Sequence, residues 1–197
     1  MDFNIDKYDG NLLHDRFAYK FFKDKVLPIG NILCFRAPME VLADGMIDQE
    51  DIDRQEFIWS DDAINFLWEI PILDNAFGAV AYQRLFNTHI ANLLSGAKYL
   101  NCPVKMDGDD IMVEKEFTQG GVTQQEGKVS VSITYVKSGI ALGHTALNIK
   151  AGKKAPAFAF STEFNDEVAE EFMKDVQKLF YELNDDMFIA TSKVIIK

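Results

Sequence analysis

Apolar residues recur at helical spacing in three stretches of the chain, residues 12–23, 76–95 and 165–184. This spacing predicts three amphipathic helices, the last of them capped by Ser161 or Thr162. The apolar stripe expected on the second helix consists of Val80, Ala81, Leu85, Ile90, Leu93 and Leu94. A fourth, shorter helix is expected from Ser60, where a hydroxyl and two acids precede an apolar run that ends at Pro71.

Between the second and last helices the pattern changes to alternation, which is typical of strands. Residues 129–135 alternate apolar with Ser or Thr, and residues 141–150 form their expected antiparallel neighbour across a Ser138–Gly139 turn. Shorter strands are expected at residues 111–113 and at residues 32–36, the latter closed by Pro38. Because helices and strands come in blocks, the chain (residues 1–197) predicts a single α+β domain with a mixed or antiparallel sheet flanked by helices.

Composition agrees with a soluble globular domain, since 48% of the 197 residues are hydrophobic and 26% are charged. The net charge of −11 argues against a nucleic-acid partner, because phosphate contacts need clustered Lys and Arg. No apolar run is long enough to span a bilayer, so no membrane partner is expected. Cys34 and Cys102 lack a metal-binding spacing, and reduced thiols together with an acidic start indicate a cytoplasmic protein.

Several polar residues are candidates for chemistry because they fall at turns and strand ends. Asp109 and Asp110 belong to an Asp-Gly-Asp-Asp run that could bind a hard cation or form a solvated turn. Lys128 opens the next strand, where it could hold a phosphate, polarise a carbonyl or stay solvated. His144 and Asn148 are four residues apart on one strand, so both face one side, which either lines a pocket or is exposed.

Two arginines lie on predicted core elements. Arg36 leaves a buried strand and needs a partner, which the acidic loop of residues 44–51 could supply. Arg84 is within an apolar helix, where it could pair with Glu69 or Asp61 or bind an anionic ligand; structural pairing is the better interpretation. His-based metal spacings and nucleotide-binding motifs are absent, so no metal ligand is assigned and the cofactor stays unknown.

The order of several short segments resembles an uncharacterised family best known from archaea, domain-of-unknown-function family 366. The similarity covers residues 16–150. The segments that carry it are Phe35-Arg36-Ala37-Pro38, Met46-Ile47-Asp48-Gln49-Glu50-Asp51, Ser60-Asp61-Asp62, the helix of Tyr82 and Arg84, residues 107–111, residues 127–133 and Leu147-Asn148-Ile149.

A more distant resemblance is to the catalytic core of biotin and lipoate protein ligases, which share the class II aminoacyl-tRNA synthetase-like sheet. It implies that Asp109 and Asp110 match an Asn-Asp pair before a strand, that Lys128 matches the lysine near the acyl-adenylate, and that Asn148 matches a strand-ending Asn. The family's Gly- and Arg-rich phosphate loop is not matched, since only the segment around Arg36 takes its place.

Two functions follow as hypotheses. In the first, the protein is a small-molecule ligase or acyl/nucleotidyl transferase acting on a carboxylate or other anionic metabolite. It predicts an apolar pocket where Arg36, Lys128 and His144 converge, with Arg36 as anion clamp and Asp109 or Asp110 orienting Lys128 or a metal ion. In the second, a non-catalytic binding or accessory protein keeps the same scaffold. The resembled ligases also imply a homodimer paired at a sheet edge.

Overall fold

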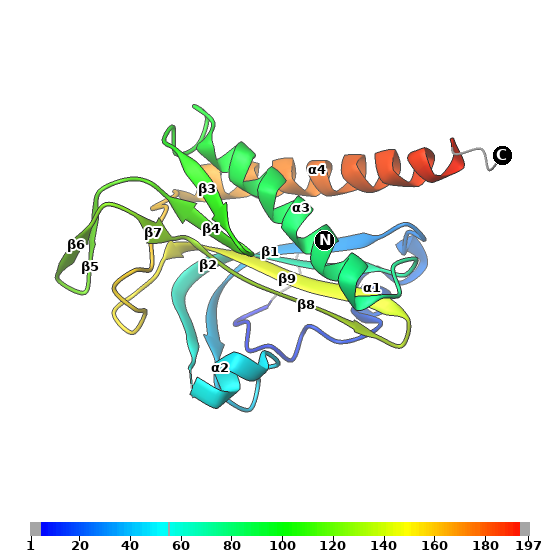
Figure 1. The fold of residues 1–197 in the computed structure, drawn as a ribbon, viewed down its shortest axis with the longest axis horizontal. Coiled ribbons are helices and arrows are strands. Elements are labelled where there is room, and N and C mark those ends of the chain that lie inside the picture. Colours follow the sequence, from blue (N-terminus) through cyan, green and yellow to red (C-terminus); the bar gives the residue numbers. More distant parts are fainter. Residues whose placement is uncertain (1–4, 55, 194–197) are drawn as a thin grey trace.

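Four antiparallel strands in the order β1-β2-β9-β8 form the central sheet (Figure 1). The computed structural model describes residues 5–54 and 56–193. The strands are β1 (Asn31–Val41), β2 (Ile58–Ile70), β8 (Ser130–Lys137) and β9 (Ile140–Lys150). Together with the helices this confirms the α+β class and the antiparallel sheet, and β8 and β9 pair across the expected turn.

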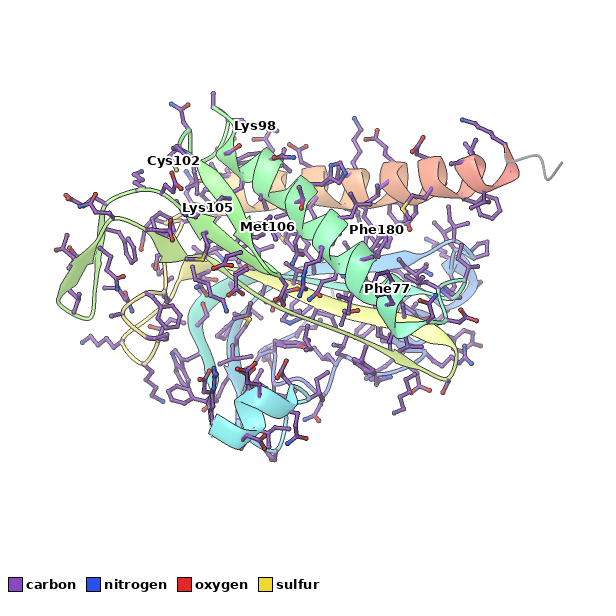
Figure 2. All side chains as sticks on the ribbon, viewed as in Figure 1. Phe77, Lys98, Cys102, Lys105, Met106 and Phe180 are labelled. Atoms are coloured by element: carbon purple, nitrogen blue, oxygen red, sulfur yellow. The ribbon has the colours of Figure 1, made fainter. Side chains whose placement is uncertain are left out.

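Two long helices, α3 (Ala76–Ser95) and α4 (Asp166–Ser192), cover one face of the sheet (Figure 1). Between them lies a core rich in aromatic rings, in which the fully buried Phe86 and Phe180 meet edge to face with ring centroids 5.7 Å apart. Figure 2 shows Phe180 in this layer and Phe77 at the start of α3, where its side chain is 87% exposed. No helix in the described part has the length and apolar character that a membrane span requires.

The opposite face of the sheet is covered by less regular chain. It consists of the N-terminal segment with α1 (Phe17–Phe22) and the 3-10 turn η1 (Lys23–Lys25), and of the connection from β1 to β2 with α2 (Gln49–Arg54). Leu33, Leu67 and Ala146 point into this second core, whereas their strand neighbours Ile32, Trp68 and Leu147 point towards the long helices. The central strands β2 and β9 are therefore buried on both faces.

Two smaller sheets stand beside the central one. The first has the order β3-β4-β7 and consists of β3 (Val104–Asp107), β4 (Asp110–Val113) and β7 (Gly127–Lys128). The second is a hairpin of β5 (Phe117–Gln119) and β6 (Val122–Gln124), which projects from the body in Figure 1. Residues 107–110 form the tight β3–β4 turn, with Gly108 at φ +61°, so the turn interpretation of this acidic run is confirmed.

The helix expected from Ser60 is wrong, because residues 58–70 form β2. Ser60 is fully buried, and its hydroxyl donates to the carbonyl of Lys150 on β9 instead of capping a helix. A central strand covered on both faces is almost continuously apolar, so the run after Asp62 lacks the alternation by which a half-buried strand is recognised. Periodicity alone cannot separate such a strand from a short buried helix.

α3 has its expected bounds, whereas α4 starts one residue later than expected and continues past residue 184 to Ser192. The predicted stripe of α3 is correct in its second half, where Ile90 and Leu94 are fully buried. It is wrong in the first half, where Val80 and Leu85 are exposed and Tyr82 and Phe86 are buried instead. Similarly, β1 does not stop before Pro38 but continues to Val41. The pairing register shifts between Ala37 and Met39, and β1 is an edge strand, which is where a proline is tolerated in a sheet.

Asn165, rather than Ser161 or Thr162, caps α4. Its Oδ1 accepts from the backbone N–H of Val168 at 2.9 Å. Ser161 Oγ instead accepts from the N–H of Ala151, and Thr162 Oγ1 donates to the carbonyl of Asn148. We expect Asn165→Ala to lower the free energy of unfolding by about 1 kcal/mol, measured by urea denaturation. Asn165→Asp, which keeps the acceptor, should retain stability; equal losses in both variants would contradict this assignment.

Candidate functional site

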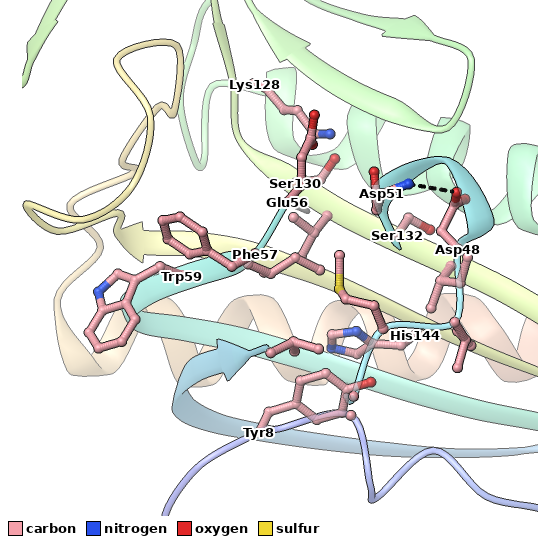
Figure 3. A pocket seen from close by; sticks show the side chains of 18 of the residues that line it. Tyr8, Asp48, Asp51, Glu56, Phe57, Trp59, Lys128, Ser130, Ser132 and His144 are labelled. Carbon is pink, nitrogen blue, oxygen red and sulfur yellow. Dashed lines mark hydrogen bonds between the residues drawn. The ribbon is translucent and has the colours of Figure 1, made fainter. Parts of the chain in front are cut away.

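A cavity of about 200 Å³ lies between the central sheet and the irregular layer that covers its second face (Figure 3). The sheet contributes its floor, the β1–β2 connection with α2 forms one wall, and the N-terminal segment closes one end. Its apolar lining residues include Leu13, Val41, Met46, Ile47, Ile58, Val131, Ile133 and Phe158. The cavity therefore offers a mainly apolar volume that suits a small molecule.

Three of the residues singled out in the sequence line this cavity: Lys128, His144 and Asn148. His144 and Asn148 face the same side of β9, as their spacing predicts, and are only 3% and 6% exposed. Their side is therefore a covered, pocket-lining face and not a solvated one. Figure 3 shows Lys128 at one end of the cavity and His144 at the other.

Lys128 is held rigidly at its end of the cavity. Its backbone N–H donates to the carbonyl of Phe158, and its own carbonyl accepts from the N–H of Phe160, each at 2.8 Å. The ammonium group lies 2.8 Å from Asp110 Oδ1. Burial raises the pKa of Asp110, and the bond to Lys128 offsets part of that increase. Of the two aspartates expected beside Lys128, Asp110 is thus the one that contacts the lysine and can orient it.

The cavity also contains carboxylates that the sequence analysis did not select. Asp48, Asp51 and Glu56 line it from the β1–β2 connection. Burial raises the pKa of Asp51, repulsion from Asp48 and Glu56 adds to this effect, and Lys128 counteracts it. Among the described lining residues Lys128 alone carries a positive charge, so it is the one electrostatic attraction for an anion here.

His144 is fixed by a chain of hydrogen bonds whose direction can be deduced. The Asn65 Nδ2 group donates to the backbone carbonyls of Ala37 and Ala63, so its Oδ1 must accept. That oxygen lies 3.0 Å from His144 Nε2, which is therefore the protonated nitrogen. The ring stacks on Tyr8 with centroids 3.9 Å apart, and burial lowers the pKa of His144 to about 3.

This depressed pKa makes the stability of the fold depend on pH. The unfolded chain binds a proton at this histidine near pH 6.5, whereas the folded chain resists protonation until about pH 3. Stability from this group is therefore complete above pH 6.5 and is lost as the pH falls from 6.5 towards 3. We expect a loss of about 2 kcal/mol between pH 7 and pH 5, an order-of-magnitude value from linkage.

Urea denaturation of the wild type and of His144→Phe at both pH values tests this expectation. Phenylalanine keeps the stacking on Tyr8 but cannot bind a proton, so the difference between the two pH values should shrink by about 2 kcal/mol in the variant. An identical difference in both proteins would show that His144 is not buried in its neutral form.

Arg36 does not lie in the cavity, so the expected convergence of Arg36, Lys128 and His144 is wrong. Arg36 faces the side of the sheet that carries the long helices. Its guanidinium makes two bonds to Asp62, at 2.9 and 2.6 Å, and one of 2.6 Å to Asp166 at the start of α4. The partner is therefore not the acidic loop of residues 44–51, and Arg36 joins two strands and a helix instead of clamping an anion.

Arg84 and Asp109 are likewise outside the cavity, on the α3 side of the sheet. They pair with each other at 3.4 Å, which confirms structural pairing for Arg84 but not with Glu69 or Asp61. Asp109 also accepts from Gln83 at 3.3 Å, and its carbonyl accepts from Asn87. The two aspartates of the turn are thus divided, since Asp110 contacts Lys128 and Asp109 contacts α3.

The sequence analysis did not predict the cavity residues Tyr8 and Trp59, nor Asn65, which lies outside the cavity lining and fixes His144. Their importance depends on contacts between distant segments, such as Tyr8 on His144, and a single sequence does not display such contacts. The acidic loop of residues 44–51 is visible in the sequence, but the sequence suggests Arg36 as its partner and not the cavity. Within the described residues no group of His, Cys, Asp and Glu side chains is arranged to hold a metal ion.

Comparison with known families gives a match to a domain of unknown function (DUF366) over residues 3–195. The chain belongs to this family. A comparison of the DUF366 chain with curated proteins found no match.

Solved structures resemble the DUF366 chain over most of its length. A protein of unknown function from Pyrococcus horikoshi superposes with a TM-score of 0.83 at 24% identity, covering 100% of this chain and 96% of the other. LipL1 of P. falciparum in complex with lipoate gives a TM-score of 0.52 at 15% identity, covering 92% of this chain and 59% of its own. A biotin protein ligase from Aquifex aeolicus with biotin gives 0.45 at 8% identity, covering 76% and 61%. The superposition on LipL1 shows that the DUF366 chain shares the fold of that protein, in agreement with the ligase-like fold that the sequence predicts.

Proposed function

We propose that the cavity binds a small molecule that has an apolar body and a carboxylate, with the carboxylate at Lys128. The protein then acts on this acid as a small-molecule ligase or acyl/nucleotidyl transferase. The observation that carries the proposal is the position of Lys128, an oriented cation at one end of a mainly apolar cavity. The fold shared with LipL1, which was solved in complex with lipoate, is consistent with an acid of this kind.

The charges around Lys128 leave room for one carboxylate. An ammonium group has three donors, and Asp110 uses one of them, so two can point to a ligand. Burial and the neighbouring carboxylates raise the pKa of Asp51, so protonation that relieves its repulsion of a bound carboxylate costs less than for an exposed aspartate. A multiply charged anion is disfavoured, since Asp48 and Glu56 also line the cavity.

For the enzymatic function, Lys128 stabilises the charge that develops when the acid reacts. In a ligase reaction the carboxylate oxygen attacks the α-phosphorus of a nucleoside triphosphate, and pyrophosphate leaves with the electron pair of the broken bond. A cation held 2.8 Å from its orienting carboxylate needs little rearrangement to stabilise that charge. If the substrate were a thioester instead, Lys128 would likewise stabilise the negative charge that develops on it during the reaction.

A second function, non-catalytic binding of the acid, is favoured by the same acidic wall. Asp48, Asp51 and Glu56 would repel the phosphates of a nucleotide at the cavity. Arg36, whose segment takes the place of the ligases' phosphate loop, is already bound to Asp62. An acid could then bind without being activated.

Calorimetric titration of the purified protein with lipoate, biotin and nonanoate tests both functions, followed by incubation with ATP and Mg²⁺ while pyrophosphate is measured. Saturable binding of an acid together with acid-dependent release of pyrophosphate supports the enzyme. Binding without release supports the non-catalytic function. If none of these acids binds, the proposed carboxylate site is wrong.

A further inference from the structure

One hydrogen-bond acceptor in the cavity has no partner among the described residues. Because Nε2 of His144 donates to Asn65, its Nδ1 is unprotonated and presents a lone pair. The residue is 3% exposed and lines the cavity, yet no described residue donates to that nitrogen. The nitrogen is not enclosed, since among the described residues only Nε1 of Trp68 is a fully buried side-chain nitrogen or oxygen without a partner. Its lone pair is therefore open to the cavity and available to a donor group of a ligand.

The surroundings of His144 hold this acceptor in one position. Tyr8 stacks on the ring at 3.9 Å, and the backbone of Tyr8 is itself tied to β1 through bonds to Pro38 and Glu40, each of 2.9 Å. The tautomer cannot change without breaking the bond to Asn65, whose amide is fixed by two backbone carbonyls. The acceptor is thus preorganised, which is what selective recognition requires.

The acceptor is far from the cation. His144 is four positions from Asn148, the lining residue near Lys128, which corresponds to about 13 Å along a strand. Figure 3 shows the two ends with apolar side chains between them. A ligand that reaches both ends therefore has two polar groups joined by an apolar chain.

We propose that Nδ1 of His144 accepts a hydrogen bond from an N–H or O–H group of the ligand at the end remote from Lys128. The ligand class is then a carboxylic acid with a terminal donor, such as a hydroxyl, amide or urea, and not a plain fatty acid. This inference rests on the proposed carboxylate site at Lys128. A plain acid would displace water from this acceptor without replacing the hydrogen bond, and a site built to bond a hydroxyl rejects the analogue that lacks it.

Calorimetry with 8-hydroxyoctanoate and nonanoate tests the inference, since these acids have chains of equal length and differ only by OH against CH₃. We expect the wild type to bind the hydroxy acid about tenfold more tightly. In His144→Phe, which keeps an aromatic ring on Tyr8 but has no acceptor, the ratio of the two affinities should fall to one or below. If His144→Phe does not fold, the ratio of the two affinities in the wild type alone tests the inference.

The outcomes separate this inference from the function on which it rests. Binding of nonanoate at least as tight as that of the hydroxy acid would overturn the role of His144 and leave the carboxylate site intact. A preference for the hydroxy acid that persists in His144→Phe would mean that the hydroxyl donates to another residue, which would also overturn the role of His144. If neither acid binds, the carboxylate site fails and the inference fails with it.

Discussion

Gly143→Ala should lower the free energy of unfolding by about 3 kcal/mol, a large loss for one methyl group. Gly143 lies on β9 directly opposite Trp68 of β2, and the indole covers the glycine. A Cβ at this position would be 2.0 Å from Trp68 Cζ2 and 2.1 Å from Cε2. Both strands are buried in the core, so neither can move aside without disrupting the packing. Urea denaturation measures the effect.

A second substitution shows whether the clash is the cause. Trp68→Phe removes the atoms that the new methyl group would meet, and it also removes Nε1, a buried donor with no partner among the described residues. We expect Trp68→Phe combined with Gly143→Ala to be more stable than the sum of the two single losses predicts. Gly96→Ala, whose Cβ would approach only the carbonyl of Leu93 at 3.2 Å, is the mild control. Additive losses would mean that Gly143 is required for another reason.

Lys128→Met should weaken binding of the acid about 100-fold. Methionine retains the apolar stem, whereas the two free donors of the ammonium group are lost and the ligand carboxylate has no other cation among the described lining residues. Removal of one partner from a buried charged pair costs about 2–5 kcal/mol, which corresponds to this loss of affinity. Calorimetric titration of the wild type and of Lys128→Met with the same acid gives the ratio of their dissociation constants.

The control for this change is Lys137→Met, at the end of β8, where the lysine pairs with Asp15 and does not line the cavity. It should bind the acid as the wild type does. Thermal unfolding of both variants checks that the fold is intact. If Lys128→Met and the wild type bind the acid equally, the carboxylate lies elsewhere.

The sequence predicts best those elements whose pattern has one interpretation. The helix of residues 76–95 has bounds that agree with α3, and β9 begins one residue before its predicted start, because long periodic segments with clear flanking turns have few alternatives. β2 was misjudged because its burial depends on what covers its second face. That cover consists of the N-terminal segment with Tyr8, which is distant in sequence, and of the β1–β2 connection with Met46, and both have little regular structure.

The candidate site divides in the same way: local patterns predict some of its residues, and the others depend on how distant segments meet. Alternation along one strand correctly placed His144 and Asn148 together. The face of Arg36 relative to Lys128, by contrast, depends on the strand order β1-β2-β9-β8, which no local pattern contains. The unprotonated Nδ1 of His144 follows only from the amide of Asn65, which belongs to β2, a segment whose sequence pattern predicts a helix.

The most direct test of the account is a crystal structure of the protein with 8-hydroxyoctanoate bound. We predict that one carboxylate oxygen lies about 2.8 Å from Nζ of Lys128 and that the hydroxyl donates to Nδ1 of His144. The chain between them should run along Val131 and Ile133 on the floor of the cavity. An acid bound outside this cavity, or one with its carboxylate at His144, would contradict the account.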